Sequence, residues 1–285
     1  MQVAFYHYSK LMLEKLHFKR KVMKNFKLKC KTYAKCRVPF AWVGGKSRLA
    51  KDIIALMPEH KTYAEVFGGA LSVFYQKAPS KLEIINDINS DLINLHHIIK
   101  TKPLSLQIEL NNMLRSREIF ELIKNKAIKP RNNVQKAAFY YYLISLSFGA
   151  KMDNFAMSKN LRSPKNIYKS FEIYSKRLKM ALIENLSYEK FIKEYDSKET
   201  LFYLDPPYIG TESYYKMPRA FDLKSHESLA FILKGVRAKF ILSYNDCSVV
   251  RELYKDFNIK EVSTNYSLNI NSINKKAKEL IIMNY

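Results

Sequence analysis

The chain has 285 residues, of which 47% are hydrophobic, so it is long enough for one large or two moderate globular domains and is not intrinsically disordered. No apolar run approaches the roughly 18–20 residues of a membrane span, and Lys and Arg interrupt residues 10–37, which excludes a signal-peptide core. We therefore expect a cytoplasmic protein without a membrane partner. Its net charge of +23 is typical of a nucleic-acid-binding protein, but a lysine-rich organism would produce the same charge.

Cysteine and histidine spacing gives no sign of a metal site. Cys30, Cys36 and Cys247 form no C-x-x-C pair, and none of the six histidines lies in an H-E-x-x-H pattern. We expect neither bound zinc nor a disulfide framework.

Residues 1–37 form a basic amino-terminal extension. They contain eleven Lys and Arg, a single acid at Glu14, and no Gly or Pro. Such a segment could be a helical arm on DNA, a poorly ordered tail, or translated sequence upstream of a later start such as Met23. We favour the two interpretations that give it no function.

An α/β pattern follows over residues 38–100. Apolar spacing predicts an amphipathic helix over 49–57, a strand over 62–67, a short helix after Gly69, a strand over 82–85, and a helix that places Ile88, Leu92, Leu95 and Ile99 on one face. Alternating strands and helices predict a parallel sheet with right-handed crossovers.

Residues 101–170 are helix-patterned and show no strand alternation, so we interpret them as a helical insertion into the sheet domain. They include a glycine-bearing loop at 147–155. We expect Tyr140-Tyr141-Tyr142 to pack between helices and His96 and His97, in the preceding helix, to be structural.

The strand and helix alternation resumes at residue 171. It predicts strands over 181–184, 200–205, 239–244 and 279–285, with helices beginning near Ser225 and spanning about 246–255. The sheet domain is therefore discontinuous in sequence and comprises residues 38–100 and 171–285.

The first glycine turn, Gly44-Gly45-Lys46-Ser47, is similar to the end of a phosphate-binding loop. That motif requires a glycine at position 40, where this chain has Phe, and a strand directly before the loop. A nucleoside triphosphate site is therefore not expected here.

The second glycine turn, Phe67-Gly68-Gly69, ends a predicted strand and allows a ligand to approach the backbone closely. Asp87 ends the next strand, where a carboxylate can accept hydrogen bonds from a ribose diol. Ser72 stands where a dinucleotide fingerprint has its third glycine. The pattern indicates a cofactor that contains a nucleoside but no pyrophosphate.

A third loop, Asp205-Pro206-Pro207-Tyr208, follows a predicted buried strand, and the two prolines stop the strand and stiffen the loop. The Asp205 carboxylate and the Pro206 carbonyl can both accept N–H bonds from the exocyclic amine of a base, which favours a nucleophilic nitrogen. Tyr208 offers a ring on which an extruded base can stack. The same chemistry would serve adenine N6 and cytosine N4.

These motifs together resemble the Dam-type, or D12 class, family of DNA adenine-N6 methyltransferases, over residues 39–285. The matching segments, in order, are Pro39 through Lys46, Tyr63 through Gly69, Asn86 through Asn89, Asp205 through Tyr208, Phe240 through Asp246, and Leu280 through Tyr285. Two departures are Ala70-Leu71, where many relatives have more glycine, and Ala41, where the best-known members have a basic residue.

The resemblance implies a Rossmann-like sheet with a helical DNA-recognition insertion at 101–170. It implies S-adenosylmethionine as the cofactor, and the residues expected to bind it are Trp42, Gly44, Gly45, Lys46, Glu65, Phe67, Gly68, Gly69, Asp87 and Asp205. The expected catalytic residues are Asp205, Pro206, Pro207 and Tyr208, acting on an adenine flipped from double-stranded DNA. We expect a monomer, with a cognate restriction endonuclease as an open question. The alternatives are an N4-cytosine methyltransferase and a catalytically silent DNA-binding relative.

Overall fold

The computed structural model describes residues 37–156, 166–211, 220–265 and 276–285; residues 1–36 of the basic extension lie outside the described part. The strands are β1 Thr62–Glu65, β2 Leu82–Asn86, β3 Leu182–Glu184, β4 Thr200–Leu204, β5 Lys239–Asn245, β6 Asn258–Asn265 and β7 Lys276–Met283. The helices are α2 Ala50–Ala55, α3 Ser90–Thr101, α4 Pro103–Asn111, α5 Arg117–Lys124, α6 Asn133–Leu146, the 3-10 turn η1 Phe148–Ala150, α7 Glu172–Leu178, α8 Tyr188–Tyr195, α9 Leu223–Gly235 and α10 Ser248–Leu253.

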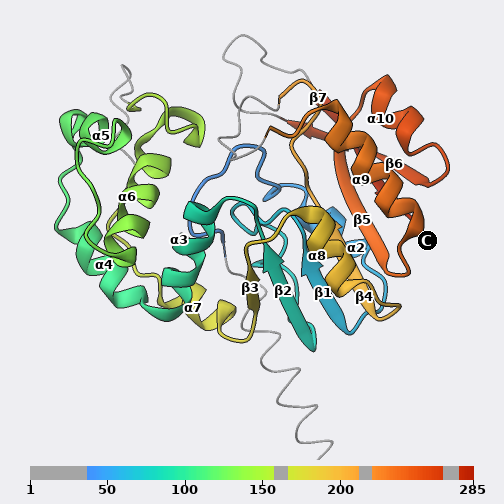
Figure 1. The fold of residues 1–285 in the computed structure, drawn as a ribbon, viewed down its shortest axis with the longest axis horizontal. Coiled ribbons are helices and arrows are strands. Elements are labelled where there is room, and N and C mark those ends of the chain that lie inside the picture. Colours follow the sequence, from blue (N-terminus) through green and yellow to red (C-terminus); the bar gives the residue numbers. More distant parts are fainter. Residues whose placement is uncertain (1–36, 157–165, 212–219, 266–275) are drawn as a thin grey trace, which may run out of the picture.

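The seven strands form one sheet in the order β3-β2-β1-β4-β5-β7-β6 (Figure 1). The first five strands are parallel, while β7 runs antiparallel to both β5 and β6. The order 3-2-1-4-5 is that of a Rossmann fold, in which the direction of winding reverses between β1 and β4. The predicted Rossmann-like parallel sheet is confirmed, and a β6-β7 hairpin completes it.

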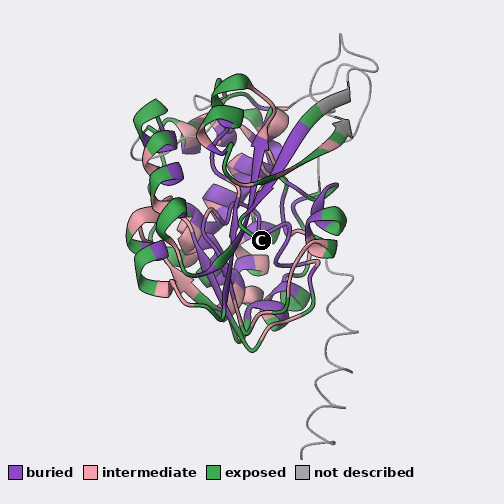
Figure 2. Cartoon of the chain, turned by 90° about the vertical axis from the view of Figure 1, so that its right-hand side faces the viewer, coloured by how far each residue is buried: buried purple, intermediate pink, exposed green. Residues whose placement is uncertain are grey.

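Helices cover both faces of the sheet, and alternate strand residues enter two separate cores. In β4, Leu201 and Tyr203 belong to one core, while Phe202 and Leu204 belong to the other. The first core includes side chains of α2, α3, α6 and α7, and the second those of α8, α9 and α10. All residues of β4 are buried, as expected for a parallel strand covered on both sides (Figure 2).

Helices α4, α5 and α6 lie beside the sheet and contact it through α3 (Figure 1). Tyr140, Tyr141 and Tyr142 are buried in α6, and the Tyr142 hydroxyl donates to the Leu114 carbonyl at 2.8 Å and accepts from the Ser116 N–H at 3.0 Å. The prediction that these tyrosines pack between helices is confirmed. The division at residues 101 and 170 stays a prediction.

The short helix expected after Gly69 is wrong: successive turns replace it. Leu71 has a left-handed φ of 61°, which a helix does not allow. The Phe74 N–H donates to the Glu65 carboxylate at 3.2 Å and so takes no part in a helical ladder. Helix α3 also begins later than expected, at Ser90, because the Asn89 side chain accepts the first free N–H groups and caps it.

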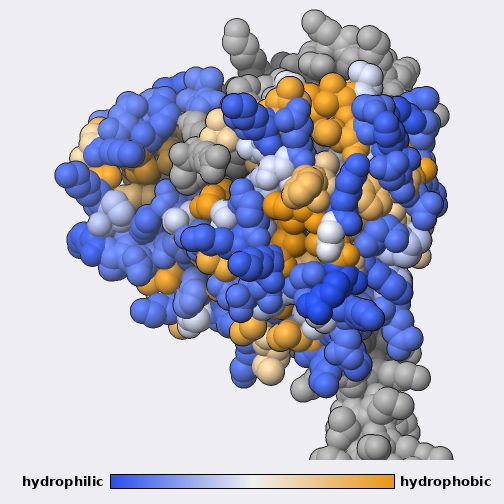
Figure 3. Space-filling view, turned by 45° about the vertical axis from the view of Figure 1, so that its right-hand side comes forward, coloured by the Kyte–Doolittle hydropathy of each residue, from blue (hydrophilic) through white to orange (hydrophobic). Residues whose placement is uncertain are grey.

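Among the described helices, none is long and apolar enough to cross a bilayer. Hydrophilic side chains cover most of the face in Figure 3, in line with the excess of 49 Lys and Arg over 26 Asp and Glu.

Candidate active site

The carboxyl ends of β1, β2 and β4 meet at one edge of the sheet because the three strands are parallel and in register. The loops after them line one pocket, together with the first glycine turn. Ten of the predicted site residues line it: Trp42, Gly45, Lys46, Glu65, Phe67, Gly68, Gly69, Asp87, Asp205 and Pro207. The other three, Gly44, Pro206 and Tyr208, do not line it: the Gly44 carbonyl accepts a hydrogen bond from Lys46 Nζ at 2.7 Å, and Pro206 and Tyr208 are buried.

The loop after β1 requires glycine for two reasons. Gly69 has a φ of +50°, and a Cβ there would lie 2.8 Å from the Cδ1 and Nε1 atoms of Trp42. A Cβ on Gly68 would lie 2.8 Å from the Asn86 carbonyl oxygen. The loop therefore packs directly on the Trp42 ring and on the end of β2, and its backbone faces the pocket.

Asp87 connects this loop to the end of β2. Its Oδ2 accepts the Gly69 N–H at 3.0 Å, and its Oδ1 accepts the Asn89 N–H at 2.9 Å. Burial raises the pKa of Asp87, and these backbone donors act in the opposite direction. Each carboxylate oxygen can accept a further hydrogen bond from a ligand such as a vicinal diol.

His96 is a supporting residue, as expected from its helix position. Its Nε2 lies 2.7 Å from the Gly69 carbonyl oxygen. Burial lowers the pKa of His96 to about 4, so the ring is neutral and Nε2 carries the donated proton. The buried imidazole thus fixes the outer side of the glycine loop.

Glu65 is 2% exposed at the end of β1. Its Oε2 accepts the Tyr63 hydroxyl at 2.7 Å and the Phe74 N–H at 3.2 Å. Burial, assisted by the nearby charge of Asp205, raises the pKa of Glu65 to about 8. The buried Glu65 carboxyl therefore keeps its proton to a higher pH than a free carboxylic acid does.

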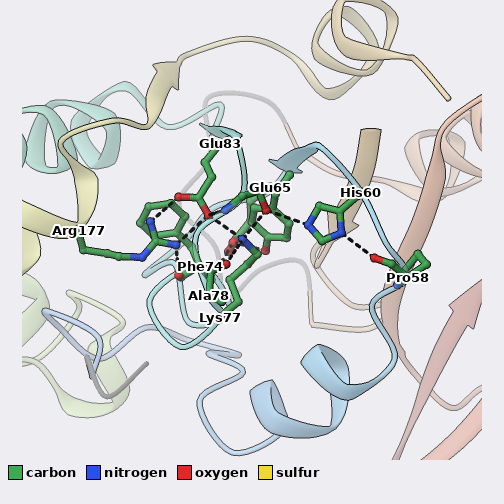
Figure 4. A network of polar contacts seen from close by, with 10 residues as sticks. Pro58, His60, Glu65, Phe74, Lys77, Ala78, Glu83 and Arg177 are labelled. Carbon is green, nitrogen blue, oxygen red and sulfur yellow. Dashed lines mark hydrogen bonds and ion pairs between the residues drawn. The ribbon is translucent and has the colours of Figure 1, made fainter. Parts of the chain in front are cut away.

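Glu83, Lys77 and Arg177 form a buried ion cluster near Glu65 (Figure 4). Glu83 at the start of β2 accepts hydrogen bonds from Arg177 and, at 2.6 Å, from Lys77. Arg177 Nη2 also donates to the Phe74 carbonyl at 2.8 Å, so the cluster fixes the residue whose N–H group reaches Glu65. The sequence pattern did not predict this cluster, because Arg177 lies 94 residues from Glu83 in the chain.

Asp205 follows β4 and forms an ion pair with Lys46, whose Nζ is 2.8 Å from Oδ1. Burial raises the pKa of Asp205 to about 6, against the opposing effect of Lys46 and with a contribution from Glu279. The Asp205 carboxylate is therefore paired with the Lys46 cation in this structure.

The ring of Tyr208 is only 7% exposed, which differs from the open stacking face expected from the sequence. Lys46 Nζ lies 4.5 Å from the ring centroid, and the ring of Tyr244 stacks with it at a centroid distance of 5.8 Å. The hydroxyl donates to Glu279 Oε2 at 2.6 Å. A base can stack on Tyr208 only after a neighbour such as Lys46 moves.

Two parts of the site were not predicted from the sequence. Glu279 reaches it from β7, and its sequence signal is a single acid directly before the apolar run 280–283. The loop at 147–155 brings Ala150, Lys151 and Met152 to the pocket, and two of these have a positive φ, Ala150 and Met152. The glycine-bearing sequence indicated a loop at these residues but not that the loop lies against the pocket.

The fold is Rossmann-like, and one pocket at the carboxyl ends of its parallel strands is lined by both Asp87 and Asp205. Residues 42–268 match the family model of the D12 class N6 adenine-specific DNA methyltransferases. The chain belongs to this family, as the resemblance of its motifs implied.

The alignments with three named relatives span nearly the whole length of each relative. The chain is 31% identical over 278 residues to the Type II methyltransferase M1.LlaDCHI of Lactococcus lactis subsp. cremoris, covering 87% of this chain and 95% of the relative. It is 26% identical over 283 residues to the Type II methyltransferase M.MjaIII of Methanocaldococcus jannaschii, covering 86% and 97%. It is 25% identical over 272 residues to the DNA adenine methylase of Escherichia coli, covering 87% and 95%.

Proposed function

We propose that this protein transfers a methyl group from S-adenosylmethionine to the exocyclic N6 of an adenine flipped out of double-stranded DNA. The observation that carries the proposal is one pocket lined by both Asp87, which would accept a diol, and Asp205, which would accept an amine. Family membership agrees with it.

The residues of the pocket fit the proposed cofactor. The oxygens of Asp87 would accept the ribose hydroxyls, and the bare backbone at Gly68 and Gly69 leaves room beside them. A second, mainly apolar pocket shares Phe67 and Ile88 with the first and would hold the purine ring. When bound, S-adenosylmethionine supplies an electrophilic methyl group on a positively charged sulfur.

The residues of the β4 loop would activate the amine. The Asp205 carboxylate and the Pro206 carbonyl would each accept one N–H of the adenine amine, so its lone pair points at the methyl carbon. The bound cofactor would supply the methyl group to the amine nitrogen and keep the electron pair of its C–S bond on sulfur. The amine then loses one proton, for which Asp205 is the adjacent acceptor.

The helical region and its pocket loop would contact the DNA. Residues 101–156 contain nine Lys and Arg against four Asp and Glu, which suits a phosphate backbone. We propose that the enzyme acts as a monomer on cytoplasmic DNA. The term Type II in two relatives' names makes a cognate restriction endonuclease part of this proposal.

Modification-sensitive sequencing of DNA from a methylation-deficient host that expresses this chain tests the proposal. We expect N6-methyladenine at one short motif and none in cells that express Asp205→Ala. Methylcytosine at a motif would support the N4-cytosine alternative instead. Unmodified DNA beside a folded, DNA-binding protein would favour the silent relative.

A further inference from the structure

Glu279 is a buried carboxylate in a strand whose next three residues, 280–282, are all apolar and buried. In the sheet it lies opposite Asn245 at the end of β5 and opposite Val262 of β6. Because β7 is antiparallel, its early residues reach the edge where the parallel strands end. Burial of a carboxylate at such a position costs folding free energy unless the carboxylate is paired, so the partners of Glu279 indicate its role.

Two partners of Glu279 within the described residues belong to the loop after β4 and to the first glycine turn. Its Oε2 accepts the Tyr208 hydroxyl at 2.6 Å and lies 4.0 Å from Lys46 Nζ. Lys46 is in turn 2.8 Å from Asp205 Oδ1 and 4.5 Å from the centre of the Tyr208 ring. One carboxylate thus contacts both the ring and the cation that hold the loop in place.

We propose that Glu279 is a positioning residue for methyl transfer, which fixes the Tyr208 ring through its hydroxyl and offers Lys46 a second anion. The inference rests on the proposed function. The substrate amine requires Asp205 to release Lys46, and a cation left in a buried site without an anion would oppose that release. Glu279 keeps Lys46 neutralised while Asp205 turns to the amine.

The proposal predicts a kinetic effect without a large binding effect. Glu279 does not line the cofactor pocket. Glu279→Gln keeps the shape but removes the charge, so kcat should fall about tenfold or more while Kd for S-adenosylmethionine stays within about threefold. Glu261→Gln, on the exposed face of neighbouring β6, is the matched control and should retain the wild-type kcat.

The pH profile separates positioning from simple structural support. The described charged and titratable groups around Asp205 are Lys46, Glu65, Tyr203 and Glu279. The negative charge of Glu279 raises the pKa of Asp205, so its removal should move the acidic limb of the rate profile to lower pH. A purely structural role would lower the rate without moving this limb.

The decisive experiment is a double-mutant cycle of Glu279→Gln and Tyr208→Phe, which remove the same hydrogen bond from its two ends. We expect the losses in kcat to be strongly non-additive and the acidic limb to move only where Glu279 is replaced. Additive losses, a wild-type kcat or an unshifted limb in Glu279→Gln would overturn the proposal. The same cycle can be measured by thermal unfolding, which detects the hydrogen bond between Tyr208 and Glu279 without any methyl transfer. Coupling in unfolding with no methyl transfer by the wild type would count against the proposed function, whereas methyl transfer without coupling would count against the role of Glu279.

Discussion

Replacement of Gly69 by Ala tests the packing of the cofactor loop on Trp42. The new Cβ meets two separate penalties: a φ of +50° and a distance of 2.8 Å to the Trp42 ring atoms Cδ1 and Nε1. The left-handed backbone alone costs about 1–2 kcal/mol, and displacement of a packed ring adds about 1–3 kcal/mol. We expect Gly69→Ala to lower the unfolding free energy by about 2–5 kcal/mol.

Two other glycines provide matched controls. Gly210 has a φ of +83°, but a Cβ added there would have no atom of the described residues within 4 Å, so Gly210→Ala should show the backbone penalty alone. Gly235 ends α9 without a positive φ, and no atom in the described part of the chain would lie within 4 Å of its Cβ, so Gly235→Ala should be stabilising by about 0.4–1 kcal/mol. Comparison of the unfolding free energies of the three variants therefore separates the cost of backbone strain from the cost of the contact with Trp42.

The assay combines urea unfolding with calorimetric titration of S-adenosylmethionine. Because Trp42 lines the pocket, its displacement in Gly69→Ala should weaken cofactor binding about tenfold or more, while Gly210→Ala should keep the wild-type affinity. In a Trp42→Ala background, Gly69→Ala should cost no more than Gly210→Ala does. Equal stability and equal affinity of Gly69→Ala and Gly210→Ala would refute the proposed contact.

Three further predictions concern carboxylates. Because burial raises the pKa of Asp205 to about 6, kcat/KM for the cofactor should decline as pH falls through 6, and a profile flat to pH 5 would contradict the required ionised form. Asp87→Ala should weaken cofactor binding by calorimetry far more than it changes the unfolding midpoint, and unchanged affinity would move the ribose site elsewhere. Glu83→Gln leaves two buried cations without their shared anion and should cost about 3–5 kcal/mol in urea unfolding, whereas Glu172→Gln, at an exposed pair, should cost nothing measurable.

Strands β1 to β5 and β7 were predicted from the sequence, mostly as short apolar runs that end at a turn signal, whereas β6, with the sequence NIKEVSTN, is not such a run and was not predicted. Residues 200–205 illustrate this, since two prolines end the strand and the observed β4 stops at Leu204. The same reasoning located Gly69 and Asp87, whose hydrogen bond joins two strand ends that must be adjacent in a parallel sheet.

The features that were not predicted from the sequence depend on contacts between residues that are distant in the chain. The turn after Gly69 reads as a helix because its apolar spacing suits one, but the Glu65 carboxylate takes the Phe74 N–H that a helix would use. Glu279 enters the site only through the antiparallel register of the β6-β7 hairpin, which local pattern does not encode. The burial of Tyr208 likewise follows from Lys46 and Glu279 and not from the loop's own sequence.

The most direct test of the central claim uses purified protein, duplex DNA and S-adenosylmethionine with an isotopically labelled methyl group. After digestion to nucleosides, mass spectrometry should find the label in N6-methyl-2′-deoxyadenosine for the wild type and not for Asp205→Ala, while both proteins bind the cofactor. Label in N4-methyl-2′-deoxycytidine, or undiminished labelling of adenine by Asp205→Ala, would contradict the account.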